Sequence, residues 1–195
     1  MVKMQFQIGV ARRICETIGT VEMPSVSEKL GHMAAQAAMV EGLVYGMESG
    51  GGYYNGYYVP DRNLMYTAQV LTQQLYPEFI TSMREIAGGG LIMLPSSVQD
   101  FKNPEISKYI TATQNSAIWT SQEKGKLMKL AWDAIGSEFA SRHTQYEMFY
   151  AGAQFVTRGH ALRTYDWDRS KNLVDSILDS YCLEDIIGKS NIAAE

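Results

Sequence analysis

The sequence lacks the features of nucleic-acid-binding, membrane-spanning and disulfide-rich proteins. Its longest basic cluster is Arg12-Arg13, and its net charge is −4 over 195 residues, whereas a nucleic-acid-binding face needs a basic stripe. No apolar run approaches the roughly 20 residues that span a bilayer, and the N-terminus has no signal-peptide core. The two cysteines, Cys15 and Cys182, lie near opposite ends of the chain and favour reduced thiols. We therefore expect a cytoplasmic protein with neither a nucleic-acid nor a membrane partner.

Motifs for several kinds of catalysis are also missing. The scattered histidines His32, His143 and His160 form neither H-E-x-x-H nor paired E-x-x-H motifs, which argues against zinc and di-iron sites. Residues 188–190 (GKS) end like a phosphate-binding loop, but Leu183 stands where that loop needs glycine. The sequence also has no G-x-S-x-G or C-x-x-C motif. We predict no metal site.

Helical periodicity is what the chain does contain. Because no segment alternates apolar and polar residues in sustained fashion, we predict almost no β-structure. The length and the 46% apolar content suit one domain. Pro77 is expected to kink the third helix or restart it. The predicted helices cover residues 2–18, 26–48, 61–75 with 77–87, 104–113, 122–150, 153–164 and 168–181.

The predicted second helix is apolar on two faces. Val26, Leu30 and Met33 begin a line that shares one face. Small side chains form a seam on the roughly opposite face, where another helix could approach closely. That seam consists of Gly31, Ala35, Ala38 and Gly42. We expect this helix at the centre of a bundle or at a subunit interface.

Capping boxes are predicted at the starts of two helices. Ser25 and Glu28 have S-x-x-E spacing ahead of the helix at residues 26–48, and Thr120 and Glu123 have T-x-x-E spacing ahead of residues 122–150. In such a box the two side chains satisfy free backbone N–H groups at the helix start. Asp168 is expected to cap the last helix.

An aromatic stripe lies on the predicted helix at residues 122–150, with Arg142 at its border. The stripe consists of Phe139, His143, Tyr146 and Tyr150, within an arc of about 60°. It would suit a wall against a planar aromatic ligand, oriented by Arg or His. The alternative is an ordinary bundle core in which Arg142 pairs with Glu138 and His143 with Glu147. The residues alone leave both interpretations open.

The segment at residues 88–97 (GGGLIMLPSS) is a second candidate site. Its glycines would let the backbone approach a ligand closely, and Ser96 and Ser97 could donate hydrogen bonds to phosphate or amide oxygens. The alternative is a helix C-cap followed by an ordinary loop. No lysine of a phosphate-binding loop follows these glycines.

Two stretches resemble the oxygenase components of two-component, reduced-flavin-dependent aromatic monooxygenases. They are residues 87–109 (AGGGLIMLPSSVQDFKNPEISKY) and residues 129–167. The second contains the family's G-x-x-F-x-x-R-x-x-x-Y-E-x-x-Y-x-G run from Gly136 to Gly152. The family includes 4-hydroxyphenylacetate 3-hydroxylases and chlorophenol or nitrophenol 4-monooxygenases, and the second stretch looks closest to the chlorophenol and nitrophenol branch.

This resemblance implies an all-α fold: an antiparallel four-helix bundle with extra C-terminal helices, like the C-terminal domain of acyl-CoA dehydrogenases. It implies one domain over residues 1–187 and a flexible tail at 188–195. The last helix, at residues 168–181, would be an oligomerisation arm in a homotetramer. The implied cofactor is FAD, reduced by a separate flavin reductase, and the substrate is a phenol.

The resemblance also implies site residues. The substrate-binding residues would be Phe139, Arg142, His143, Tyr146 and Tyr150. The cofactor-binding residues would be Gly89, Gly90, Ser96 and Ser97.

Family members carry an N-terminal helical domain and a middle β-domain that this chain lacks. We therefore expect an isolated C-terminal domain with no catalytic residue of its own and no activity alone. A competing hypothesis is a non-catalytic helical oligomerisation module without flavin binding, which the doubly apolar second helix would suit. A flavin-dependent dehydratase of the 4-hydroxybutyryl-CoA type has the same architecture but needs an iron–sulfur cluster, for which two cysteines offer no support.

Overall fold

The computed structural model describes residues 1–182, most of which are helical. The predicted tail at 188–195 and residues 183–187 of the predicted domain lie outside this range. The elements in chain order are α1 (Val2–Ile18), α2 (Pro24–Ser49), β1 (Gly52–Tyr54), β2 (Tyr57–Val59), α3 (Arg62–Ala87), the 3₁₀ turns η1 (Gly88–Leu91) and η2 (Val98–Lys102), α4 (Pro104–Thr113), α5 (Ser121–Ile135), α6 (Glu138–Phe149), α7 (Gln154–Thr164) and α8 (Trp167–Leu178).

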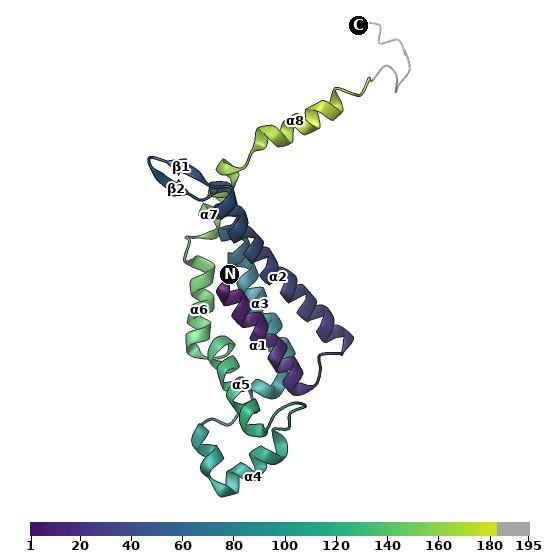
Figure 1. Ribbon diagram of the computed structural model, residues 1–195, viewed down its shortest axis with the longest axis vertical. Helices are drawn as coiled ribbons and strands as arrows, with labels where there is room; N and C mark the ends of the chain where they lie inside the picture. Colours follow the sequence, from purple (N-terminus) through teal and green to yellow (C-terminus); the bar gives the residue numbers. More distant parts are fainter. Residues whose placement is uncertain (183–195) are drawn as a thin grey trace, which may run out of the picture.

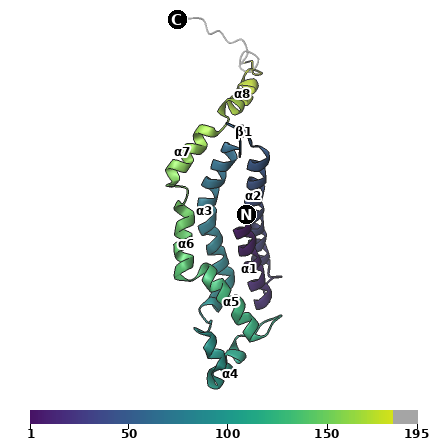
Figure 2. The ribbon, with the colours of Figure 1, turned by 60° about the vertical axis from the view of Figure 1, so that its left-hand side comes forward.

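The helices form an elongated antiparallel bundle around α3. Helices α1, α2 and α3 lie side by side, and α5, α6 and α7 follow one another along the bundle (Figures 1 and 2). Contacts join α3 to α2, α6 and α7, and α1 to α2, α3 and α5. Helix α4 lies at one end, and α8 extends away from the opposite end (Figure 1). The predicted all-α bundle with extra C-terminal helices is confirmed.

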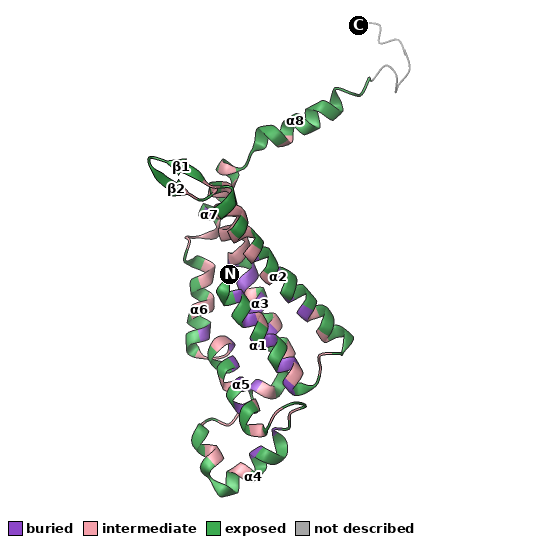
Figure 3. Ribbon diagram, in the orientation of Figure 1, coloured by how far each residue is buried: buried purple, intermediate pink, exposed green. Residues whose placement is uncertain are grey.

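The core lies where α3 faces α1, α2 and α5, and buried positions follow those faces (Figure 3). Burying an aliphatic or aromatic side chain of this size stabilises a fold by roughly 1.5–3 kcal/mol. The largest fully buried apolar side chains are Phe79, Ile14, Met33, Ile80, Met83, Met128 and Ile135. No helix within residues 1–182 is long and apolar enough to cross a membrane.

The prediction of one continuous helix at residues 122–150 is wrong. It breaks after Ile135, where Gly136 ends α5 and the Ser137 hydroxyl caps α6 by accepting from Ala140 N. An ideal Cβ on Gly136 would lie 2.6 Å from the Trp132 ring, so the turn requires glycine. Arg84 of α3 also donates from Nε and Nη2 to the Ile135 carbonyl, at 2.8 and 2.6 Å. A neighbouring helix thus satisfies the end of α5.

Two of the predicted helix starts are corrected and one is confirmed. Helix α2 begins at Pro24 with Met23 as its N-cap and no side-chain cap, so Ser25 lies inside the helix and cannot form the predicted box. Helix α8 is capped by Asp166, which accepts from Arg169 N, rather than by Asp168. Thr120 and Glu123 form the predicted capping box of α5.

Pro77 lies inside the third helix, α3, and does not divide it. The helix runs without a break through the proline. Leu75, Tyr76 and Phe79 are buried on either side of Pro77. Their burial against the neighbouring helices offsets the loss of one backbone hydrogen bond.

The small-residue seam of α2 is open rather than covered. Gly31, Ala35, Ala38 and Gly42 are exposed, whereas Leu30 and Met33 on the other side are buried. The prediction that α2 is buried on two faces is therefore wrong for residues 1–182. The other expectation, a subunit interface at this seam, stays a prediction.

A short hairpin interrupts the otherwise helical chain between α2 and α3. Strands β1 and β2 pair antiparallel, with Tyr53 opposite Tyr58. Asn55 and Gly56 form the turn with φ of 49° and 84°, a left-handed conformation that Asn and Gly adopt most readily. Almost no β-structure was predicted, and this hairpin is the exception within residues 1–182.

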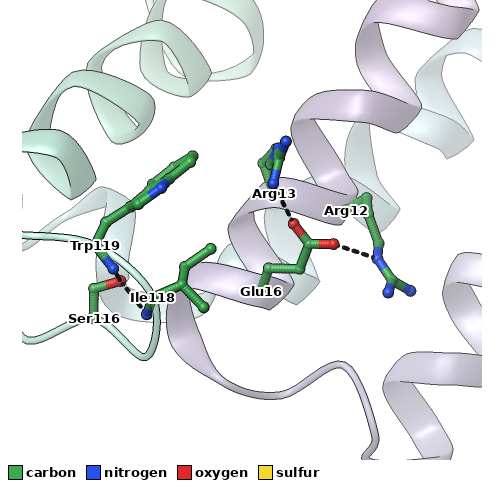
Figure 4. Close-up of polar contacts among 6 residues, drawn as sticks. All are labelled: Arg12, Arg13, Glu16, Ser116, Ile118 and Trp119. Atoms are coloured by element: carbon green, nitrogen blue, oxygen red, sulfur yellow. Dashed lines mark hydrogen bonds and ion pairs between the residues drawn. The ribbon is translucent and has the colours of Figure 1, made fainter.

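The C-terminal end of α1 is tied to the loop that precedes α5. Glu16 accepts hydrogen bonds from Arg12 Nε and Arg13 Nη1, both at 2.9 Å, and these lower the pKa of its carboxyl group (Figure 4). The Arg13 guanidinium lies 5.6 Å from the centre of the Trp119 ring. Ala117 N donates to Thr17 O at 2.9 Å. These contacts fix where α5 begins.

Candidate functional site

The aromatic stripe of α6 forms a continuous stack. The ring centres of Phe139 and His143 are 5.8 Å apart, those of His143 and Tyr146 are 5.9 Å apart, and those of Tyr146 and Tyr150 are 5.7 Å apart. The planes of these pairs differ by only 10° to 23°. We call Phe139, His143, Tyr146 and Tyr150 the aromatic ladder. It puts four of the five predicted substrate-binding residues on one face.

The ladder is exposed at both ends and partly buried at His143. Phe139 is 72% exposed and Tyr146 is 58% exposed. Tyr150 lines a cavity of about 270 Å³ between α1, α2 and α3, together with Thr72, Tyr76 and Glu147. An open row of large rings is a surface on which a planar ligand can stack.

Two charged side chains, Glu147 and Lys3, lie next to His143. Glu147 Oε1 lies 3.2 Å from His143 Nε2 and also pairs with Lys3 of α1. The Tyr76 ring meets the His143 ring edge-on, with centres 5.8 Å apart. Glu147 thereby fixes the orientation of the imidazole. The His143–Glu147 pair is the one expected for an ordinary bundle helix, so packing and ligand binding both remain open for this histidine.

Arg142 is exposed beside the ladder and belongs to no ion pair among residues 1–182, so the expected pair with Glu138 does not form there. Its guanidinium is therefore available to a ligand or to solvent.

Burial raises the pKa of the Tyr76 phenol, the nearby Glu147 carboxylate raises it further, and a hydrogen bond with Gln7 lowers it. A raised folded-state pKa contributes stability below the ordinary value of about 10, and that stability is lost as pH rises through the folded pKa. As the pH rises from about 9 to about 11, the unfolding free energy of the wild type should fall. We expect a smaller fall in Tyr76→Phe, which lacks the phenol. Denaturant titration at each pH measures this slope.

The exposed Tyr54 offers the control, because it is 71% exposed on the hairpin. Tyr54→Phe should keep the wild-type alkaline slope. An unchanged slope in Tyr76→Phe would contradict the assignment.

The glycine-rich segment is held by packing and local caps. An ideal Cβ on Gly90 would lie 2.8 Å from Met128 Cε, whereas Gly89 has nothing within 4 Å. Ser97 caps η2 by accepting from Gln99 N at 3.1 Å, and Ser96 Oγ donates to Asp100 at 3.3 Å. A side chain at Gly90 would displace the flexible end of Met128, while Gly89 leaves its backbone open to a ligand. The cofactor role of these four residues stays a prediction.

A cavity of about 490 Å³ lies between this segment and α5. Its walls include Leu94, Pro95, Val98 and Phe101, and its lysines are Lys102, Lys126 and Lys129. We call it the lysine cavity. Neither the ladder residues nor the predicted cofactor residues Gly89, Gly90, Ser96 and Ser97 line it, so the structure does not bring the two predicted sets of site residues into one cavity.

Sequence patterns did not single out these lysines because they are spread over two elements. Lys126 and Lys129 are three residues apart on α5, a spacing that puts both on one side of a helix, and this was the available signal. Lys102 reaches the same cavity from η2, which the sequence did not predict.

The helical bundle around α3 and its additional C-terminal helices define the class. This is a C-terminal helical domain of the acyl-CoA-dehydrogenase-like architecture. A crystal structure of the oxygenase component of 4-hydroxyphenylacetate 3-monooxygenase, complexed with FAD and 4-hydroxyphenylacetate, matches with a TM-score of 0.85 and 27% identity. The match covers 90% of this chain and 37% of that one. An archaeal 4-hydroxybutyryl-CoA dehydratase from N. maritimus matches at TM-score 0.78 and 19% identity, over 98% of this chain and 37% of that one, and shares the fold alone.

The chain belongs to the 4-hydroxyphenylacetate 3-hydroxylase family, whose C-terminal model matches residues 1–179. It is 35% identical over 164 residues to the 4-hydroxyphenylacetate 3-monooxygenase oxygenase component of Pseudomonas aeruginosa, covering 83% of this chain and 32% of that protein. It is 33% identical over 186 residues to the Escherichia coli counterpart, covering 92% and 36%. The family prediction is confirmed, and the chain spans about a third of the length of these relatives.

An oxygenase named for a nitrophenol is also among the relatives. The oxygenase component of 4-nitrophenol 2-monooxygenase from Rhodococcus sp. is 29% identical over 166 residues, covering 84% of this chain and 32% of that protein. The particular likeness to the chlorophenol and nitrophenol branch stays a prediction.

Proposed function

We propose that this chain is the C-terminal helical domain of a cytoplasmic, reduced-FAD-dependent phenol monooxygenase of the chlorophenol or nitrophenol type. It would contribute one wall of the flavin and phenol pocket and part of the interface of a homotetramer. The observation that carries the proposal is the aromatic ladder on α6, which is open at Phe139 and Tyr146 and backed by charge at His143. A separate flavin reductase would supply reduced FAD by diffusion.

The side chains of the ladder fit the recognition of a phenol. Phe139 and Tyr146 would contact the faces of the ring, because aromatic side chains pack against planar ligands in stacked or edge-on geometry. Arg142 and His143 would stabilise the negative charge of a phenolate oxygen. Glu147, which holds His143 at 3.2 Å, would act as a positioning residue.

The bound cofactor would supply the electrons: the phenol, O2 and reduced FAD give the hydroxylated phenol, oxidised FAD and water. The chain's own residues would bind and orient the ring and exclude water from it. Gly89, Gly90, Ser96 and Ser97 would contact the flavin from the η1–η2 segment, where Gly89 leaves the backbone accessible.

The oligomer interface would be built on α8. Helix α8 has no buried residue, and an isolated helix of 12 residues is marginal in water. An apolar groove of about 440 Å³ at its base is lined by residues that include Val70, Leu162 and Trp167. A neighbouring subunit that covers these surfaces would stabilise the arm.

The test uses a full-length oxygenase that carries this chain as its C-terminal part. Phe139→Ala should weaken phenol binding by about 0.5–1.5 kcal/mol through the lost ring contact. Titration with 4-nitrophenol, a chlorophenol and 4-hydroxyphenylacetate measures this effect and ranks the substrates.

Phe155→Ala is the matched control, because Phe155 is 79% exposed on α7 and lies outside the ladder. Phenol affinity unchanged in Phe139→Ala would remove the ladder from the substrate site.

A second candidate substrate is 4-hydroxyphenylacetate, because the relatives at 33–35% identity are oxygenases named for it.

A further inference from the structure

Helix α6 carries the aromatic ladder, but little side-chain burial holds it against the bundle. Within residues 138–149 Ala140 is the one buried residue, and Phe139 and Tyr146 are mostly exposed. A helix of 12 residues is also marginal in water by itself. The position of α6 therefore depends strongly on polar contacts with neighbouring helices.

Arg84 of α3 binds the chain just before α6. Its Nε and Nη2 both donate to the Ile135 carbonyl, at 2.8 and 2.6 Å. Ile135 is the last residue of α5, so its carbonyl has no partner within that helix. The positive charge of the guanidinium also suits this place, because the C-terminal end of a helix carries partial negative charge. Arg84 thereby fixes the point from which α6 starts.

Gln73 of the same helix binds the chain just after α6. Its side-chain Nε2 donates to the Gly152 carbonyl at 2.8 Å. Gly152 has a φ of 105°, a left-handed conformation that glycine adopts readily, and it lies in the turn between α6 and α7. Gly152 is three residues beyond the end of α6, just as Ile135 is three residues ahead of its start. The two contacts are therefore placed symmetrically along the chain.

The orientation of the Gln73 amide is set by a second buried side chain. Gln73 is 1% exposed, and the fully buried Thr157 of α7 donates from Oγ1 to Gln73 Oε1 at 2.9 Å. Because Oε1 can only accept, this bond directs the Nε2 donor toward Gly152. A buried amide whose oxygen and nitrogen are both paired is costly to displace.

The spacing of the two α3 residues matches the length of α6. Gln73 and Arg84 are eleven residues apart, which is close to three helical turns, so they lie on the same side of α3. At 1.5 Å per residue they are about 16 Å apart along the helix axis, and the 12 residues of α6 span about 18 Å. The later residue of α3 binds ahead of α6 and the earlier one binds beyond it, as antiparallel helices require. Helix α3 thus holds both ends of α6.

We propose that Arg84 and Gln73 are positioning residues of the oxygenase, which fix the aromatic ladder through hydrogen bonds to the backbone at both ends of α6. This inference rests on the proposed function, in which the ladder contacts the phenol ring. Loss of one bond leaves α6 attached to α3 mainly at its other end, so the ladder shifts relative to α3. The flavin is not displaced in the same way, because the hydrogen bonds of both side chains lead only to Ile135, Gly152 and Thr157.

Two variants of a full-length oxygenase that carries this chain test the proposal. Gln73→Met and Arg84→Met remove the donors and keep long unbranched side chains. Each should lower the rate of 4-hydroxyphenylacetate or 4-nitrophenol hydroxylation by about tenfold to a hundredfold, because a small misplacement of a reacting ring costs that much. FAD affinity should not change. Arg84→Lys keeps a donor for the Ile135 carbonyl and should recover most of the rate.

The yield of hydroxylated product per O2 consumed separates a positioning role from a loss of folded enzyme. With the phenol displaced, reduced FAD and O2 give oxidised FAD and hydrogen peroxide instead of hydroxylated product. The yield should therefore fall in Gln73→Met and Arg84→Met, whereas a smaller amount of intact enzyme would leave the yield unchanged. Arg84 is exposed, so Arg84→Met tests the proposal even where Gln73→Met does not fold.

Gln36→Met is the matched control. Gln36 is 9% exposed, and its Nε2 donates to Glu78 of α3 at 3.0 Å. The control removes a comparable amide contact of α3 but leaves both bonds at the ends of α6 intact. Its product yield per O2 should equal that of the wild type, and circular dichroism checks that each variant is folded.

Hydrogen exchange of the backbone amides measures the attachment of α6 itself. Residues 139–150 should exchange faster in Gln73→Met and Arg84→Met than in the wild type or in Gln36→Met, because a helix held at one end opens more often. Wild-type exchange or wild-type product yield in both Met variants would overturn the proposal. An equal fall in yield in Gln36→Met would also overturn it, because the effect would then be one of stability. Unchanged phenol affinity in Phe139→Ala would instead contradict the proposed function, and the exchange rates decide the attachment of α6 independently of that result.

Discussion

Replacing Leu173 and Ile177 with Asp is expected to turn a self-associating chain into a monomer. The two side chains are 66% and 49% exposed, and they lie four residues apart on the same side of α8. Val174 and Leu178 extend this apolar side and are 55% and 57% exposed. Two carboxylates buried against a neighbouring subunit would lack partners, and an unpaired buried charge strongly destabilises an interface. Sedimentation velocity at micromolar concentration measures the change in mass.

Asn172→Asp with Ser176→Asp is the matched control, because it adds the same charge to the polar side of α8. This variant should sediment like the wild type. A wild-type chain that is itself a monodisperse monomer, or a Leu173→Asp and Ile177→Asp variant of unchanged mass, would show that α8 is not an association arm.

This chain, supplied by itself with reduced FAD, O2 and a phenol, is expected to hydroxylate nothing above the protein-free background. Oxygen transfer needs the flavin and the phenol held within near-attack distance in a site that excludes water. The ladder is a wall without an opposite side, since Phe139 and Tyr146 are mostly exposed. The loss relative to a full-length enzyme is thus expected to be complete. Chromatography of the product, with 4-nitrophenol and 4-hydroxyphenylacetate as substrates, measures it.

A full-length oxygenase that carries this chain should restore turnover in the same assay. That comparison separates an incomplete site from an unsuitable substrate. Turnover by the chain alone would falsify the proposal that its site is shared with other parts of a longer protein.

The sequence predicted the helical class and most helix positions, because apolar periodicity depends on local spacing. It placed the aromatic ladder correctly on one face, since Phe139, His143 and Tyr146 lie within α6 and Tyr150 is its C-cap. The break at Gly136 escaped prediction because it depends on tertiary contacts: the Trp132 ring fills the space beside the glycine, and Arg84 of a distant helix binds the last carbonyl of α5.

Pairings between distant segments were likewise beyond local patterns. Lys3 reaches Glu147 across the bundle, and Lys102 joins Lys126 through a turn that has little periodic signal. The open face of α2 has a different cause. Apolar and small residues indicate that a surface will be covered, but they do not say whether the cover comes from the same chain.

The turn between α5 and α6 also resets the rotational phase of the chain. In an uninterrupted helix, inserting one residue would rotate every following side chain by about 100°. Here Gly136 and Ser137 end one helix and begin the next, so a length change at this turn need not rotate the ladder. The direction in which the ladder faces is therefore set by the start of α6 at Ser137 and not by the register of α5.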